Sequence, residues 1–286
     1  MVNTLTTQIK PDKKTITSTN RMREGLEITR DAKKNFDKLD LEISKLINAI
    51  QKKHGFMSLF SKKSSQENRE KAFTRLDCHY RESYLKTQTG LETIAESVQE
   101  ILSSHQEEAE KLEELKKKEE EGIITLDDYR KVFSGMTCLP VLGINDTALE
   151  KLSPGIVSES KKQFKETLQK NIIQKTEMLN LLGTMFGVVV VYRDTALRNY
   201  SSYHVVSNPI KALTGSASAI QHTETESKTM SEFLILALET SVNVVDRVLC
   251  GREERGQIEE KMTASITEAG QKLKEALEKF SCSSKQ

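Results

Sequence analysis

Histidine and cysteine side chains are the groups of this sequence that could bind a metal or act as nucleophiles. No histidine lies at HExxH spacing or four residues from another histidine, which argues against a zinc site on one helix. No CxxC pair occurs, and the wide cysteine spacing favours free thiols over a disulfide framework. The residues concerned are His54, His79, His105, His204 and His222, with Cys78, Cys138, Cys250 and Cys282. We therefore expect no metal and no other cofactor.

The sequence also lacks the patterns that mark common enzyme sites. Cys78 and His79 are adjacent, and adjacent side chains on a helix point about 100° apart, so they are not expected to form a nucleophile–base pair. GxxxxGK[ST], GxSxG and a GxGxxG after a strand are all missing. We expect no catalytic residues and a non-enzymatic protein. An enzyme whose acid and base residues are not revealed by spacing is the remaining alternative.

Composition favours helices and gives no sign of a nucleic-acid partner. Charged residues make up 30% of the 286 positions, aromatic residues only 5%, and proline occurs four times. Few helix breakers and many charges are typical of long helices with solvated faces. The 43 basic and 42 acidic residues leave a net charge of +1, too small to attract nucleic acid.

The sequence shows no pattern typical of a signal peptide or an ordinary membrane-spanning helix. The first thirty residues contain no apolar core of a signal peptide, and no run reaches the roughly 18 apolar residues of an ordinary spanning helix. We expect a cytoplasmic protein, with peripheral attachment to a membrane and leaderless secretion left open.

Apolar residues repeat at three- and four-residue steps, as in coiled-coil seams. This pattern predicts an all-α fold: an elongated bundle of long antiparallel helices with coiled-coil-like seams and a short apolar hairpin or tongue. The expected segments are 1–17, a flexible start; 18–121, a long helical hairpin that begins at a capping cluster from Ser18 to Asn20; 122–157, a connector; 158–280, a second helical half; and 281–286, a flexible tail. The seam predicted for the second helix of this hairpin contains Leu91, Ile94, Val98, Ile101, Leu112 and Leu115.

A turn between the first two predicted helices combines large apolar side chains with flanking lysines. One interpretation is contact with a membrane, in which the apolar side chains enter the acyl boundary and the lysines meet anionic head groups. The other is that the apolar side chains close the end of the bundle. The candidate membrane-contact residues are Lys52, Lys53, Phe56, Met57, Leu59, Phe60, Lys62 and Lys63.

Residues 178–192 carry no charge and include Gly183 and Gly187 at GxxxG spacing. As a helix this segment is about 22 Å long, shorter than the roughly 30 Å hydrocarbon core. Its four consecutive valines also leave a strand open. The segment is either the buried centre of the bundle, a conditional membrane insertion or a partner-binding groove. The insertion candidates are Met178, Leu179, Leu181, Leu182, Gly183, Phe186, Gly187, Val188, Val189, Val190, Val191 and Tyr192.

An uncharged segment late in a heptad-rich chain is similar to the layout of helical pore-forming toxins, and the lysine-rich helices are similar to curved membrane-binding dimers. Both resemblances concern architecture, since no motif matches. We expect a non-enzymatic bundle that oligomerises and acts at an anionic membrane surface, inserting the apolar segment in the manner of pore-forming proteins. The alternative is a cytosolic coiled-coil adaptor or assembly subunit. The expected partner is a second copy or another helical protein.

Overall fold

A computed structural model describes residues 13–51, 62–125, 128, 154–206, 232–247, 249 and 258–283. Within these ranges the regular secondary structure is helical and no strand occurs. The helices pack against one another through buried apolar side chains. The predicted all-α bundle is therefore confirmed.

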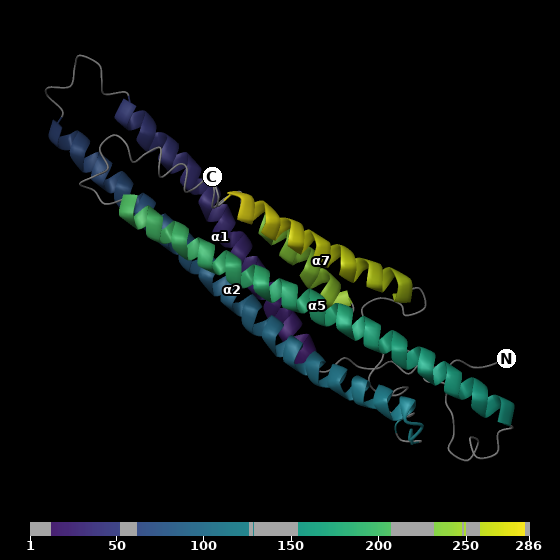
Figure 1. Cartoon of the computed structure of the whole chain (residues 1–286). Coiled ribbons are helices and arrows are strands. Elements are labelled where there is room, and N and C mark those ends of the chain that lie inside the picture. Colours follow the sequence, from purple (N-terminus) through teal and green to yellow (C-terminus); the bar gives the residue numbers. More distant parts are fainter. Residues whose placement is uncertain are drawn as a thin grey trace, which may run out of the picture. The chain divides into compact units, whose positions relative to one another are not determined.

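Five helices account for most of the described chain (Figure 1). Four of them are α1 (Lys13–Gln51), α2 (Lys62–Glu120), α5 (Pro154–Val206) and α7 (Ile258–Ser283). The fifth spans residues 232–247. Proline at the first position of α5 fits a helix start, because its missing N–H has no intrahelical acceptor there.

The predicted cap of the first helix was wrong. Residues 18–20 lie inside α1, which already includes Lys13. The Ser18 hydroxyl is buried and donates to Glu100 Oε2 at 2.6 Å, while Thr19 donates to the Thr15 carbonyl at 2.8 Å. These polar side chains are therefore satisfied within the packed helix and do not end it.

Residues 178–192 form the middle of α5, so the strand alternative for this segment was also wrong. Val188 and Val189 are fully buried. Burial of these side chains outweighs the small intrinsic preference of valine for strands.

The chain divides into two compact units, and each of the five helices contributes residues to both. Unit 1 comprises Met1–Thr19, Val98–Met185 and Ser241–Gln271, and unit 2 comprises Asn20–Ser97, Phe186–Thr240 and Lys272–Gln286.

Unit 1 has an apolar cluster between α2 and α5. Its members are Leu112, Leu115, Phe164 and Leu168, with Ile124 and Ile172 packed against them. Residues 121–125 lead away from the end of α2: Gly122 has a φ of 73°, and the N–H of Ile123 donates to the Lys118 carbonyl at 3.0 Å. This left-handed glycine cap satisfies the last carbonyls of α2 and lets the chain turn so that Ile124 covers the cluster.

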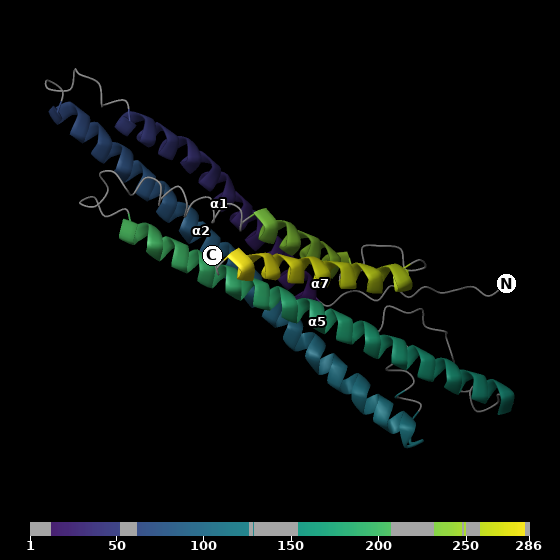
Figure 2. The ribbon, with the colours of Figure 1, turned by 45° about the horizontal axis from the view of Figure 1, so that its top comes forward.

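Unit 2 contains a close approach of α1 and α2, which lie side by side here (Figures 1 and 2). A Cβ added to Gly25 would lie 2.6 Å from the Gly90 carbonyl oxygen, and one added to Gly90 would lie 2.6 Å from that of Gly25. Thr29 completes the contact, since its hydroxyl donates to the Gly25 carbonyl at 2.8 Å. Only glycine lets the two backbones come this close.

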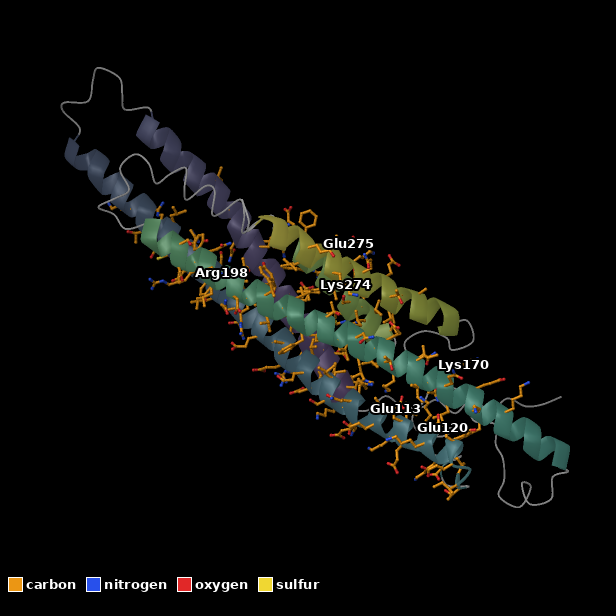
Figure 3. The ribbon with its side chains drawn as sticks, viewed as in Figure 1. Glu113, Glu120, Lys170, Arg198, Lys274 and Glu275 are labelled. Carbon is orange, nitrogen blue, oxygen red and sulfur yellow. The ribbon has the colours of Figure 1, made fainter. Side chains whose placement is uncertain are left out.

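The outer faces of the helices carry charged side chains, among them Glu113 and Glu120 of α2, Lys170 of α5 and Glu275 of α7 (Figure 3). Ion pairs on these faces, such as Lys86 with Glu82 at 2.8 Å, are solvent exposed. Each contributes little to stability and keeps the helix face soluble.

Gly90→Ala is expected to destabilise the protein by about 1 to 3 kcal/mol, because the new methyl group meets backbone that can move only if the helices separate. Gly183→Ala is the matched control: its Cβ would meet nothing within 4 Å, and alanine favours a helix by up to about 1 kcal/mol. Urea unfolding followed by circular dichroism measures both. A Gly90→Ala variant as stable as wild type would contradict the close approach.

Candidate functional site

The predicted insertion segment lies with most of its large apolar side chains inside the fold. Leu179, Phe186, Gly187 and Val190 are partly buried, while Gly183 and Val191 are exposed. None of the described helices is both long enough and apolar enough to pass through a bilayer. The buried members are Met178, Leu181, Leu182, Val188, Val189 and Tyr192.

The predicted membrane-contact turn lies mostly outside the described residues. Lys52, Lys53, Phe56, Met57, Leu59 and Phe60 are not described, and Lys62 and Lys63 are the first residues of α2 without described side chains. Contact of this turn with a membrane stays a prediction.

The predicted seam of α2 is a buried stripe. All six of its predicted apolar residues, from Leu91 to Leu115, are buried. Between Ile101 and Leu112 the same three- and four-residue steps continue through His105 and Glu108. Two polar residues therefore occupy seam positions of α2.

Lys175 of α5 meets these two residues within unit 1. Its ammonium nitrogen lies 2.7 Å from Nδ1 of His105 and also donates to Glu108. Glu108 Oε2 lies 3.5 Å from the same ring nitrogen. We call His105, Glu108 and Lys175 the polar layer. His105 is only 6% exposed and the Lys175 side chain 13%, so these two lie within the packed interface of α2 and α5, while Glu108 lies at its partly exposed edge.

The protonation of the polar layer follows from its contacts. Burial is the main cause that lowers the pKa of His105 to about 4; the nearby Lys175 ammonium acts in the same direction, and Glu108 opposes the shift. An ammonium group can only donate, so Nδ1 accepts and the neutral ring carries its proton on Nε2. At neutral pH the layer holds one ammonium, one carboxylate and one neutral imidazole.

The sequence pattern predicts the apolar seam but not the polar layer. The two residues of α2 could have been found from the sequence. The apolar seam is interrupted between Ile101 and Leu112, and the heptad steps in this interval fall on His105 and Glu108. Lys175 gave no comparable signal, because its role depends on which part of α5 faces α2.

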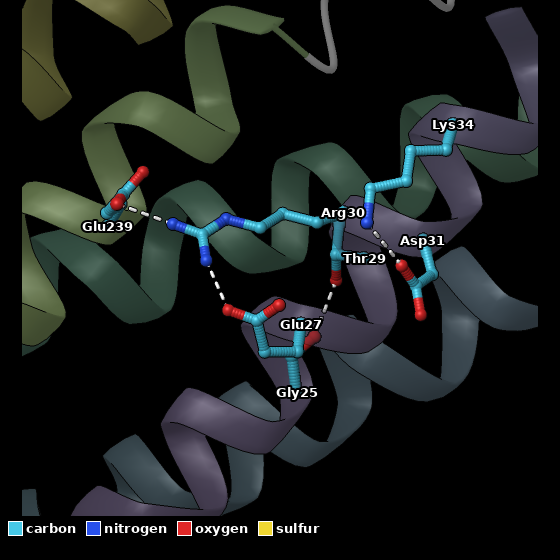
Figure 4. Close-up of polar contacts among 7 residues, drawn as sticks. All are labelled: Gly25, Glu27, Thr29, Arg30, Asp31, Lys34 and Glu239. Atoms are coloured by element: carbon cyan, nitrogen blue, oxygen red, sulfur yellow. Dashed lines mark hydrogen bonds and ion pairs between the residues drawn. The ribbon is translucent and has the colours of Figure 1, made fainter.

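Unit 2 contains a second polar cluster, centred on Arg30 of α1 (Figure 4). The guanidinium donates to Glu27 of its own helix and lies 2.5 Å from Glu239 of the helix at residues 232–247. The hydrogen bond with Glu239 is the main reason that the pKa of Arg30 is raised. One turn further, Lys33 lies 3.2 Å from Glu232 of the same partner helix. Two cations of α1 thus bind two carboxylates of one neighbouring helix.

Unit 2 also brings α2 and α5 together through aromatic rings. The rings of Tyr84 and Tyr200 stack with centroids 4.0 Å apart and planes 6° apart. Gln88 donates to the Arg193 carbonyl at 3.2 Å. Desolvation raises the pKa of Tyr84. These contacts position helices and bring no nucleophile and base together.

Among the described residues no group of three or more His, Cys, Asp or Glu side chains is arranged to hold a metal ion. No protein-family model, curated protein or solved structure matches the chain. The packing and the exposed faces of the helices are therefore the basis for a functional proposal.

A double-mutant cycle on Arg30 and Glu239 should give a coupling of about 0.5 to 1 kcal/mol, because the pair joins two helices but is partly exposed. The control pair is Asp31 and Lys34 at 2.9 Å, on the surface of one helix, where no measurable coupling is expected. Urea unfolding of the variants measures both couplings. Equal couplings would show that the Arg30 pair does not hold the helices together.

Proposed function

We propose that this chain is a non-enzymatic helical-bundle subunit that self-associates through a helix face. The observation that carries this proposal is an apolar pair on the helix of residues 232–247. Leu236 is 63% exposed and Phe233 is 42% exposed, and they lie one turn apart. Exposed apolar pairs at this spacing suit the groove of a second helix.

The contacts that hold the helix of residues 232–247 against the rest of the fold favour binding by a preformed surface. Ion pairs of Glu232 and Glu239 with α1 flank the apolar pair, and Leu234, Leu238 and Val242 are buried on the other side of the helix. A helix held on one side loses little conformational freedom when a partner covers its outer side. The apolar stripes inside the units are already occupied, so the exposed pair is the better place for a second copy.

Light scattering of the purified chain tests self-association. The wild type is expected above 32.4 kDa and the Phe233→Ser, Leu236→Ser variant at 32.4 kDa, because two apolar contacts are lost at the interface. Ile123→Ser is the matched control, since Ile123 is also exposed but lies after α2, and this variant should assemble as the wild type does. A wild type at 32.4 kDa across all concentrations would refute the proposal.

A second candidate is action at a membrane surface, favoured by the uncharged segment at residues 178–192. Its buried apolar side chains could face lipid only after α5 leaves its neighbours, so insertion would require a change of burial. A polarity-sensitive probe at Val189 reports such a change. Unchanged probe emission on addition of anionic vesicles would exclude insertion.

Surface binding without insertion needs its own measurement. Flotation with anionic liposomes is expected at low salt if the lysine-flanked turn binds head groups. Phe56→Ser with Phe60→Ser should then abolish flotation, while Phe233→Ser with Leu236→Ser should retain it. Wild type that stays at the bottom of the gradient would leave self-association as the sole proposal.

A further inference from the structure

The polar layer of unit 1 places three ionisable groups in an interface lined mainly by apolar side chains. Leu112 and Leu115 of α2 pack with Phe164 and Leu168 of α5 next to the layer. Ile101 and Met178 continue the two helices beyond it and are also buried. A change of charge in the layer therefore acts on the contact between α2 and α5.

The contacts of the polar layer can all form only while the His105 ring is neutral. Lys175 donates to Nδ1 of the ring, and this hydrogen bond disappears when Nδ1 gains a proton. Protonation also creates a second cation 2.7 Å from the ammonium in a buried position. Two cations then share one carboxylate, that of Glu108.

The charged groups that act on the His105 ring come from both helices that meet there. Glu108 is its neighbour on α2 and Lys175 faces it from α5. In the described part of the chain no third charged group contributes to the shift of its pKa. Glu108 attracts a protonated ring, but desolvation and Lys175 together outweigh this attraction.

We propose that the polar layer is an acid-sensitive switch: between pH 7 and pH 5, uptake of a proton by His105 in the opened form increasingly favours separation of α2 from α5 in unit 1. The apolar side chains of α5 that follow Lys175, starting with Met178 and Leu182, then become accessible. The switch works on the fold itself and does not require self-association or membrane binding.

The direction and size of the effect follow from linkage. A histidine whose pKa falls from 6.5 to about 4 on folding stabilises the folded form fully above pH 6.5, and this contribution is lost as the pH falls toward 4. Between pH 7 and pH 5 the equilibrium for opening is expected to rise about 20-fold from this group alone.

Hydrogen exchange of peptides from residues 172–185 measures this opening, after correction for the intrinsic effect of pH. Protection in the wild type should fall about 20-fold from pH 7 to pH 5. In His105→Gln the fall should be below about 3-fold, because the amide oxygen still accepts from Lys175 and does not titrate. His79→Gln changes an exposed histidine of α2 and should behave as wild type. An equal fall in wild type and His105→Gln would overturn the switch.

A ring titration tests the same proposal without relying on the fold of a variant. In wild-type protein the NMR signal of His105 should titrate near pH 4, and Lys175→Met should move the midpoint upward because a neighbouring cation is removed. A purely structural Lys175 would leave the midpoint where it was. A His105 midpoint near 6.5 in the wild type would overturn the proposal.

Discussion

The buried seam of α2 is the constraint on which the described fold depends. Its positions recur every three or four residues from Leu91 to Leu115, and the six apolar ones are removed from water. Burying a leucine or isoleucine side chain contributes about 1.5 to 3 kcal/mol, whereas an exposed ion pair contributes less than about 1 kcal/mol. The charged faces of α2 therefore keep it solvated, and the seam decides what it packs against.

The helix contacts of the two units each depart from uniform apolar packing, and they do so in different ways. In unit 2, Gly25 and Gly90 replace side-chain packing with backbone contact between α1 and α2. In unit 1, His105 and Glu108 replace apolar side chains and require Lys175 opposite them. A polar group in a seam costs stability but selects one register, because any other alignment leaves it without a partner. Both devices specify which parts of two long helices meet.

The functional proposals rest on the contrast between buried and exposed apolar side chains. Residues 178–192 look like an insertion element by composition, yet Val188, Val189 and Tyr192 are buried. Phe233 and Leu236 look ordinary by composition, yet they remain largely exposed on a helix held by two ion pairs. Burial, not hydropathy alone, therefore separates the apolar side chains that remain accessible from those that do not. The acid-sensitive layer adds a way to alter that burial without new contacts.

Helical periodicity was readable in the sequence because it is a local property: the three- and four-residue steps of α2 depend only on the geometry of one helix. The sequence alone therefore determined the all-α class and the six buried apolar positions of this seam. It could not show that residues 18–20 lie inside α1, because Ser18 finds Glu100 across 82 positions. Nor could it show that Lys175 meets His105, 70 positions away, or that Gly25 meets Gly90. These pairings were decided by tertiary structure, because they depend on how two helices align. Each residue by itself is compatible with many surroundings, so its type alone does not identify its partner.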